Sequence, residues 1–146
     1  MPDRAPALIR PLRVLVVDDE FLIADHMADV LTGAGHEVVG TAASAEQALG
    51  MVDGGGIDLA VVDIKLAGAM DGIALGHRLG QRGIGHVYVS GSGDAETVLR
   101  ARATGPLAFL QKPFDEARLL AALRNWARSA AASEGEAQAG PGCPEP

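Results

Sequence analysis

The sequence has a single cysteine and no apolar stretch of membrane-spanning length. Because Cys143 is the only cysteine in the 146 residues, no disulfide can form within the chain, and a reducing environment fits best. No apolar segment reaches the roughly 18 residues that a membrane span requires. The first residues, MPDRAPALIRPLR, also lack the apolar run of a signal peptide. These absences predict a soluble, cytoplasmic protein that does not associate with a membrane.

Basic residues are few and dispersed along the chain. Acidic residues outnumber them 19 to 12, which gives a net charge of -7. Electrostatic binding to nucleic acid or to an anionic membrane is therefore disfavoured. The length suits one domain with its own hydrophobic core and leaves no room for a second domain of ordinary size.

Signatures of two common kinds of catalytic site are missing. The phosphate-binding motif GxxxxGK[ST] does not occur, which excludes a P-loop nucleotidase. The four histidines lie on different predicted elements without the spacing of metal ligands, and each is predicted to be a surface or strand-edge residue: His26, His36, His77 and His86.

Short apolar runs alternate with segments of helical periodicity. The runs are continuous in their apolar character and lie at residues 14–17, 36–40, 59–62, 86–89 and 107–110. Such strands are typical of a parallel sheet that helices cover on both faces. We therefore predict an α/β fold, a doubly wound (βα)5 domain of the flavodoxin-like class with a five-stranded parallel sheet in the order 2-1-3-4-5.

Helix starts are marked by residues that can cap them, at Ser44, Asp71, Asp94 and Asp115. The fourth helix is expected to turn Val98 and Leu99 inward, and the fifth to bury a stripe that includes Leu119 and Leu123. We expect the domain to occupy residues 12–129. The ends, 1–11 and 130–146, are rich in Ala, Gly, Pro and Glu and are predicted to be a flexible N-terminus and a disordered tail.

Polar side chains follow the ends of the predicted strands. They are Asp18, Asp19 and Glu20 after the first strand, Asp63 after the third, Ser90 after the fourth and Lys112 after the fifth. The carboxyl ends of parallel strands meet at one edge of the sheet, where ligands of such folds bind. Each residue alone has a simple structural explanation as a helix cap, a turn residue or a solvated charge.

The combination points to chemistry because carboxylates in one crevice repel each other. At a dielectric of about 20 and a separation of about 4 to 5 Å, each pair costs roughly 3 to 4 kcal/mol. A divalent cation removes this cost, and hard oxygen ligands suit Mg²⁺. With a lysine and a hydroxyl opposite, the central carboxylate can attack phosphorus and form an aspartyl phosphate.

The residues at these strand ends resemble the receiver domains of two-component response regulators. The resemblance rests on VLVVDDE, VVDI, VSG and FLQKPF, in the family's order and near its spacing, and covers about residues 12 to 128. It implies that Asp63 is the phosphoacceptor and that Ser90 and Lys112 contact the phosphoryl group. It also implies a Mg²⁺ site in which Asp19 and Asp63 bind the ion, Asp18 supports it through water and the backbone carbonyl of Lys65 completes the protein ligands. Phe109 falls at the position of the family's switch aromatic, with an ordinary aromatic on an edge strand as the alternative.

The loop after Asp63 departs from the commonest family pattern. Ala67 stands where a proline is usual, and Asp71 and Gly72 come eight and nine residues after Asp63 instead of seven and eight. One residue has therefore been added, in a loop that Gly68 makes easy to form. We interpret this as variation within the family, with Asp71 as a helix cap.

The resemblance also implies the partners. A sensor histidine kinase or a histidine phosphotransfer protein would supply the phosphoryl group, and the chain would catalyse only its own phosphorylation and dephosphorylation. We expect a single-domain response regulator that signals by contact with a downstream protein or by onward phosphotransfer; a homodimer through the fourth and fifth helices is an open alternative. One alternative is a phosphorylation-independent receiver that acts as a protein-binding module. Another is a haloacid dehalogenase-type phosphatase, but that family needs an aspartate at the position where Lys65 stands.

Overall fold

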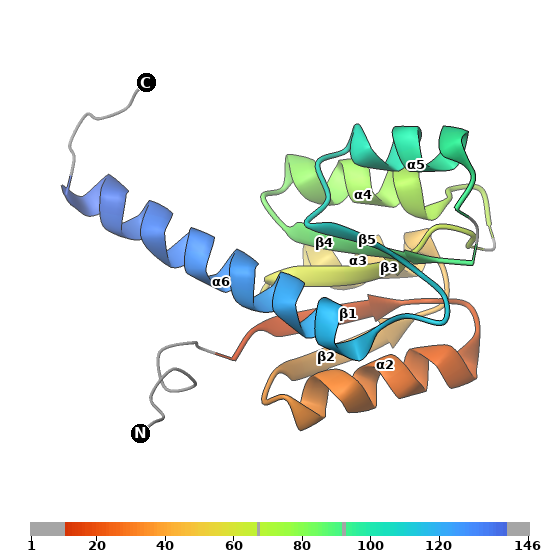
Figure 1. Cartoon of the computed structure of the whole chain (residues 1–146), viewed down its shortest axis with the longest axis horizontal. Helices are drawn as coiled ribbons and strands as arrows, with labels where there is room; N and C mark the ends of the chain where they lie inside the picture. The colour runs from red at the N-terminus through yellow and green to blue at the C-terminus, as the bar shows by residue number, and fades with distance from the viewer. Residues whose placement is uncertain (1–10, 67, 92, 140–146) are drawn as a thin grey trace.

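The computed structural model describes residues 11–66, 68–91 and 93–139 as a parallel sheet between two layers of helices (Figure 1). The elements are β1 (Arg13–Val17), α2 (Phe21–Gly33), β2 (Glu37–Ala42), α3 (Ala45–Asp53), β3 (Leu59–Asp63), α4 (Gly72–Gln81), β4 (Gly85–Ser90), α5 (Ala95–Arg102), β5 (Ala108–Gln111) and α6 (Glu116–Ala139). The sheet order is β2-β1-β3-β4-β5, and every neighbouring pair is parallel. The predicted fold class and strand order are confirmed.

The two faces of the sheet bury separate cores. Alternate residues of β1 point to opposite faces, so Val14 and Val16 pack with α2 and α6, whereas Leu15 and Val17 pack with α3, α4 and α5. All five residues of β3 are buried. This burial on both faces explains why the strands are continuously apolar in the sequence.

The predicted helix caps are present. The side chains of Ser44, Asp71 and Asp94 accept hydrogen bonds from the backbone N–H three residues later, at 3.1, 2.9 and 3.1 Å. Asp115 accepts from the N–H of Ala117 at 2.9 Å. Each cap satisfies a donor that the first helical turn leaves unpaired.

Two expectations about the helices were wrong. The side chain of Leu99 is 70% exposed, and Ala101 is the fully buried residue of α5. Leu99 lies about 100° around the helix from partly buried Val98, so it points away from the sheet.

The second error concerns the C-terminal boundary. Helix α6 continues to Ala139 and projects beyond the sheet in Figure 1, although a disordered tail was predicted from residue 130. The sequence AAASEGEAQA is alanine-rich, and alanine has the highest helix propensity. The predictions for residues 1–10 and 140–146 lie outside the described residues.

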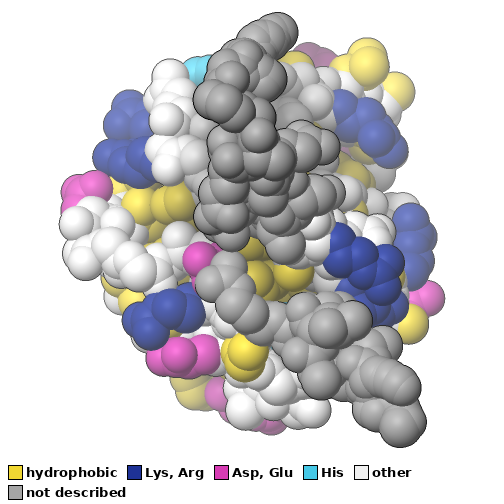
Figure 2. All heavy atoms as spheres, turned by 90° about the vertical axis from the view of Figure 1, so that its left-hand side faces the viewer, with side chains coloured by type: hydrophobic (Ala, Val, Ile, Leu, Met, Phe, Trp, Pro, Cys, Tyr) yellow, Lys and Arg dark blue, Asp and Glu magenta, His cyan; other side chains and the backbone are white. Residues whose placement is uncertain are grey.

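Where the described residues are visible on the face at the amino ends of the strands, charged side chains are dispersed. Figure 2 shows Lys and Arg side chains there in several separate groups, with acidic side chains between them. No helix among the described residues has both the length and the apolar character needed to cross a membrane.

Candidate functional site

Three aspartates come together at the carboxyl ends of β1 and β3. Asp18 and Asp63 are 2% and 4% exposed, and Asp19 is exposed. One carboxylate oxygen from each lies within 4.8 Å of the others. The structure therefore brings together the carboxylates that the strand-end pattern predicts.

Lys112 lies among these carboxylates from the end of β5. Its Nζ is 3.1 Å from Asp18 Oδ2, 3.3 Å from Asp63 Oδ2 and 3.5 Å from Glu20 Oε1. The backbone N–H of Lys112 donates to the carbonyl of Ser90 at 2.8 Å, which ties the ends of β4 and β5 together. The Lys112–Pro113 peptide bond is cis.

Backbone N–H groups hold one oxygen of each buried aspartate. Asp18 Oδ1 accepts from the N–H of Glu20 at 2.8 Å, and Asp63 Oδ1 accepts from the N–H of Lys65 at 3.3 Å. The second oxygen of each faces Lys112. Asp18 Oδ2 is fully buried and has no well-directed hydrogen-bond donor among the described residues, so its contact with the ammonium is an ion pair.

These surroundings shift two pKa values. Burial and the neighbouring charge of Asp18 raise the pKa of Asp63 to about 6, although Lys112 and the N–H of Lys65 oppose the rise. Burial alone would lower the pKa of Lys112, but its close contacts with the carboxylates of Asp18 and Asp63 outweigh that effect and raise it. Lys112 therefore stays cationic at neutral pH while Asp63 is only modestly acidic.

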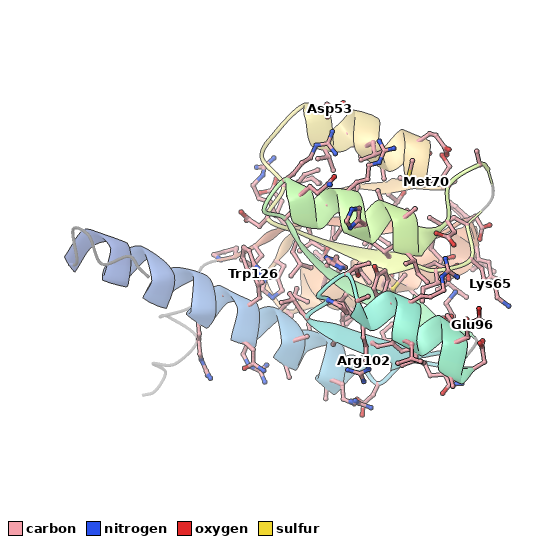
Figure 3. All side chains as sticks on the ribbon, turned by 90° about the horizontal axis from the view of Figure 1, so that it is seen from above. Asp53, Lys65, Met70, Glu96, Arg102 and Trp126 are labelled. Atoms are coloured by element: carbon pink, nitrogen blue, oxygen red, sulfur yellow. The ribbon has the colours of Figure 1, made fainter. Side chains whose placement is uncertain are left out.

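The donor set fits a divalent cation. Three hard carboxylate oxygens converge, and Asp18 Oδ2 is buried without a directed donor. Oxygen ligands of this kind suit Mg²⁺. Figure 3 shows the Lys65 side chain pointing outward, away from the sheet, so only its backbone is placed to take part. Its carbonyl as a ligand remains a prediction.

The loop after β3 returns tightly to the strand that it leaves. The N–H of Gly72 donates to the carbonyl of Ile64 at 2.8 Å. A β-carbon on Gly72 would lie 2.1 Å from the carbonyl oxygen of Asp63, so no larger residue fits without movement. Gly68 has a φ of +106°, which favours glycine. Ala67, where the family's usual proline is absent, lies outside the described residues.

Ser90 and Phe109 occupy the expected elements. Ser90 is fully buried at the end of β4, the strand beside β3. Phe109 is partly buried in the core on the α3, α4 and α5 side, with its ring centroid 6.3 Å from that of Tyr88. Contact of Ser90 with a phosphoryl group and a switch role for Phe109 remain predictions.

A buried polar network behind the site was not anticipated from the sequence. The Tyr88 hydroxyl lies 2.6 Å from Thr104 Oγ1, which also lies 3.0 Å from His86 Nε2 and donates to the Ala101 carbonyl at 2.7 Å. Burial lowers the pKa of His86 and raises that of Tyr88. A β-carbon on Gly76 would lie 2.0 Å from the Tyr88 hydroxyl oxygen. The only sequence signal was a glycine within a predicted helix.

The histidines and Glu20 also differ from expectation. His36 and His86 are buried, whereas His26 and His77 are exposed as predicted.

The contact of Glu20 with Lys112 was not predicted. Glu20 follows the two aspartates in the sequence, but the direction of its side chain cannot be read from the sequence.

Comparison with known proteins gives a consistent result. A family model described as "Response regulator receiver domain" matches residues 14–124. The chain is 32% identical over 114 residues to the transcriptional regulatory protein PdtaR of Mycobacterium tuberculosis, covering 77% of this chain and 55% of PdtaR, so it spans about half of that relative. It is 32% identical to the chemotaxis protein CheY of Treponema pallidum, covering 81% of this chain and 87% of CheY.

Solved structures of similar fold include signalling domains from several bacteria. The signal receiver domain of a modulated diguanylate cyclase from Desulfovibrio desulfuricans G20 has a TM-score of 0.76 and 29% identity, covering 82% of this chain and 95% of that one. The CheX-CheY-BeF3-Mg²⁺ complex from Borrelia burgdorferi has a TM-score of 0.72 and 26% identity, covering 81% and 94%.

Proposed function

The chain belongs to the response regulator receiver domain family, and on this basis we propose that Asp63 accepts a phosphoryl group in a Mg²⁺-dependent reaction. The observation that carries the proposal is the position of Lys112 Nζ, 3.3 Å from Asp63 Oδ2 within a group of three aspartates. A buried nucleophilic carboxylate, a fixed cation and a set of metal-binding oxygens are the parts that phosphoryl transfer needs.

The proposed step forms one bond and breaks one. A carboxylate oxygen of Asp63 attacks the phosphorus of a phosphohistidine, the P–N bond breaks, and its electron pair goes to the imidazole. Lys112 offsets negative charge on the transferred group, and the Ser90 hydroxyl donates a hydrogen bond to it. Mg²⁺, held by Asp18, Asp19, Asp63 and the carbonyl of Lys65, would offset the charge on the phosphoryl oxygens. The similar CheY from Borrelia burgdorferi, in a complex that contains BeF3 and Mg²⁺, supports this assignment.

The phosphoryl donor in this proposal is a histidine kinase or a histidine phosphotransfer protein. Phosphorylation would draw Ser90 and Lys112 toward the new anion and shift the population of two states of the face formed by α5, β5 and α6. Phe109 lies on β5 within this face, which supports its assignment as the aromatic that moves. Output would then pass by protein contact or by onward phosphotransfer.

Mass spectrometry tests the phosphoacceptor directly. The protein is treated with acetyl phosphate and Mg²⁺, and its intact mass is measured beside that of Asp63→Asn. We expect one phosphoryl adduct on the wild type and none on the variant. Asp53→Asn, which changes an exposed aspartate of α3, is the matched control and should be modified like the wild type. An unmodified wild type would favour a phosphorylation-independent receiver, and an adduct on Asp63→Asn would place the modification elsewhere.

A further inference from the structure

The ammonium group of Lys112 contacts two aspartates of the cluster and also the carboxylate of Glu20, which lies outside the cluster. Asp18 and Asp63 belong to the cluster that can hold a cation. Among the described residues, Glu20 is the third carboxylate within ion-pair distance of Lys112 Nζ, at 3.5 Å, and it also accepts a hydrogen bond from it. Lys112 is therefore placed between a deep pair of carboxylates and an outer one.

The contacts of Lys112 with Asp18 and Asp63 occupy carboxylate oxygens that a bound cation would also need. Asp18 Oδ1 and Asp63 Oδ1 accept backbone N–H groups, whereas Oδ2 of each has no backbone donor within the described ranges. Those are the two oxygens that face Lys112. Because an ammonium and a divalent cation carry the same sign of charge, they compete for these oxygens.

The Glu20 side chain is available to hold Lys112 at the exposed side of the aspartate cluster. It occupies the N-cap position of α2, where a side chain normally accepts a hydrogen bond from the first helical turn, but its side chain makes no capping bond in the described structure. The side chain is 61% exposed, compared with 16% for Lys112. The Glu20 carboxylate thus lies on the solvent side of the ammonium.

We propose that Glu20 is a positioning residue that keeps Lys112 at the site when a cation takes the inner oxygens of Asp18 and Asp63. This inference rests on the proposed function and concerns how the same site loads its metal. Without Glu20, the cluster's own oxygens are the charged partners that the described residues leave to the ammonium, so it competes more strongly with the cation. Glu20 therefore favours cation binding through Lys112, without being a ligand itself.

A double-mutant cycle on cation binding tests this route. The full chain and the variants Glu20→Gln, Lys112→Met and Glu20→Gln/Lys112→Met are titrated with Mn²⁺, and free Mn²⁺ is measured by electron paramagnetic resonance. We expect Glu20→Gln to weaken binding about five-fold when Lys112 is present and less than about two-fold in the Lys112→Met background. Glu116→Gln, which removes an exposed carboxylate near His26, is the control for net charge and should change binding less than about two-fold.

The outcomes separate this inference from the proposed function. If Glu20→Gln weakens binding equally with and without Lys112, Glu20 acts as a ligand or through its general field, and the positioning role is wrong while the metal site stands. If Glu20→Gln has no effect in either background, the role is also wrong. If the wild type binds no Mn²⁺, the proposed metal-dependent function fails together with the inference.

A second measurement does not depend on the folding of Lys112→Met. Side-chain NMR relaxation of Lys112 is recorded with and without Mg²⁺ in the wild type and in Glu20→Gln. We expect Lys112 to stay ordered in the Mg²⁺-loaded wild type and to become mobile in the Mg²⁺-loaded variant. Equal order in the two loaded proteins would overturn the inference.

Discussion

The carbonyl oxygen of Asp63 lies 2.1 Å from the position that a β-carbon on Gly72 would occupy. The start of α4 is therefore pressed against the end of β3, and the hydrogen bond from the Gly72 N–H to the Ile64 carbonyl, at 2.8 Å, fixes this approach. The backbone fixes both the carbonyl oxygen and the position of such a β-carbon, so no change of rotamer could relieve their contact. This close approach holds the end of the loop between β3 and α4 next to the proposed phosphoacceptor, Asp63.

Replacing Gly72 should disturb the site and destabilise the fold. Gly72→Ala places a methyl group on the Asp63 carbonyl, so we expect a loss of about 1 to 3 kcal/mol in the free energy of unfolding. Urea unfolding followed by circular dichroism measures this loss. Gly50→Ala is the matched control, because a β-carbon on this exposed residue of α3 would meet nothing within 4 Å. It should stabilise the protein by about 0.5 to 1 kcal/mol, and a harmless Gly72→Ala would contradict the close approach.

The buried network around Thr104 should contribute to stability as a unit. Thr104→Val removes the hydroxyl that lies 2.6 Å from the Tyr88 hydroxyl and 3.0 Å from His86 Nε2, leaving both buried groups without this partner. We expect a cost of about 1 to 3 kcal/mol. Tyr88→Phe should lower the free energy of unfolding by less, because the Thr104 hydroxyl still donates its hydrogen bond to the Ala101 carbonyl.

The double variant Thr104→Val/Tyr88→Phe distinguishes a coupled network from separate contacts. Its loss of unfolding free energy in urea should be smaller than the sum of the two single losses, because one shared hydrogen bond is counted only once. Thr32→Val, at an exposed position of α2, is the control and should be nearly neutral. Strict additivity of Thr104→Val and Tyr88→Phe would contradict the network.

Local patterns in the sequence were sufficient for most of the fold. The caps at Ser44, Asp71 and Asp94 depend on atoms within three residues, and the buried strands depend on a run of apolar side chains, so both were predicted. Leu99 was misplaced because α5 has only eight residues, too few to fix which face turns inward.

The site was predictable where the order of strands alone brings residues together. Asp18 and Asp63 end neighbouring parallel strands, so their approach follows from topology. The contact between Tyr88 and Thr104 joins residues 16 apart through side chains packed beneath a helical glycine. The contact between Glu20 and Lys112 depends on side-chain direction across 92 residues. No local pattern encodes either contact.

Removing the charge of Asp63 should stabilise the cation-free protein. Folding raises the pKa of Asp63 from 3.8 to about 6, so the folded state binds more protons than the unfolded chain between these values. Stability contributed by the protonated carboxyl is present at low pH and is lost as the pH rises through about 6. In EDTA at pH 7.5, Asp63→Asn should therefore unfold at higher urea, with a gain of about 1 to 3 kcal/mol.

This gain should shrink when the same urea titrations are repeated near pH 4.5, where the wild-type carboxyl is itself protonated. Asp53→Asn, on the exposed side of α3, should change stability by less than about 0.5 kcal/mol at either pH. An Asp63→Asn variant that is no more stable than the wild type at pH 7.5 would mean that the buried carboxylate is already compensated without a cation.

Adding Mg²⁺ should oppose the advantage of Asp63→Asn, because the cation offsets the negative charge of the three clustered aspartates that Lys112 alone leaves uncompensated. A ligand that binds only the folded state stabilises it by about 2.7 kcal/mol at 100 times its Kd. The wild type should gain stability of this size at saturating Mg²⁺, whereas Asp63→Asn and Asp18→Asn, each short of one charged ligand, should gain much less at the same concentration. Urea midpoints at pH 7.5, with KCl at matched ionic strength as the control for screening, measure the difference. Equal stabilisation of the wild type and both variants would show that Mg²⁺ acts outside the aspartate cluster. The repulsion between the carboxylates of Asp18 and Asp63 would then have to be offset by a group other than Mg²⁺.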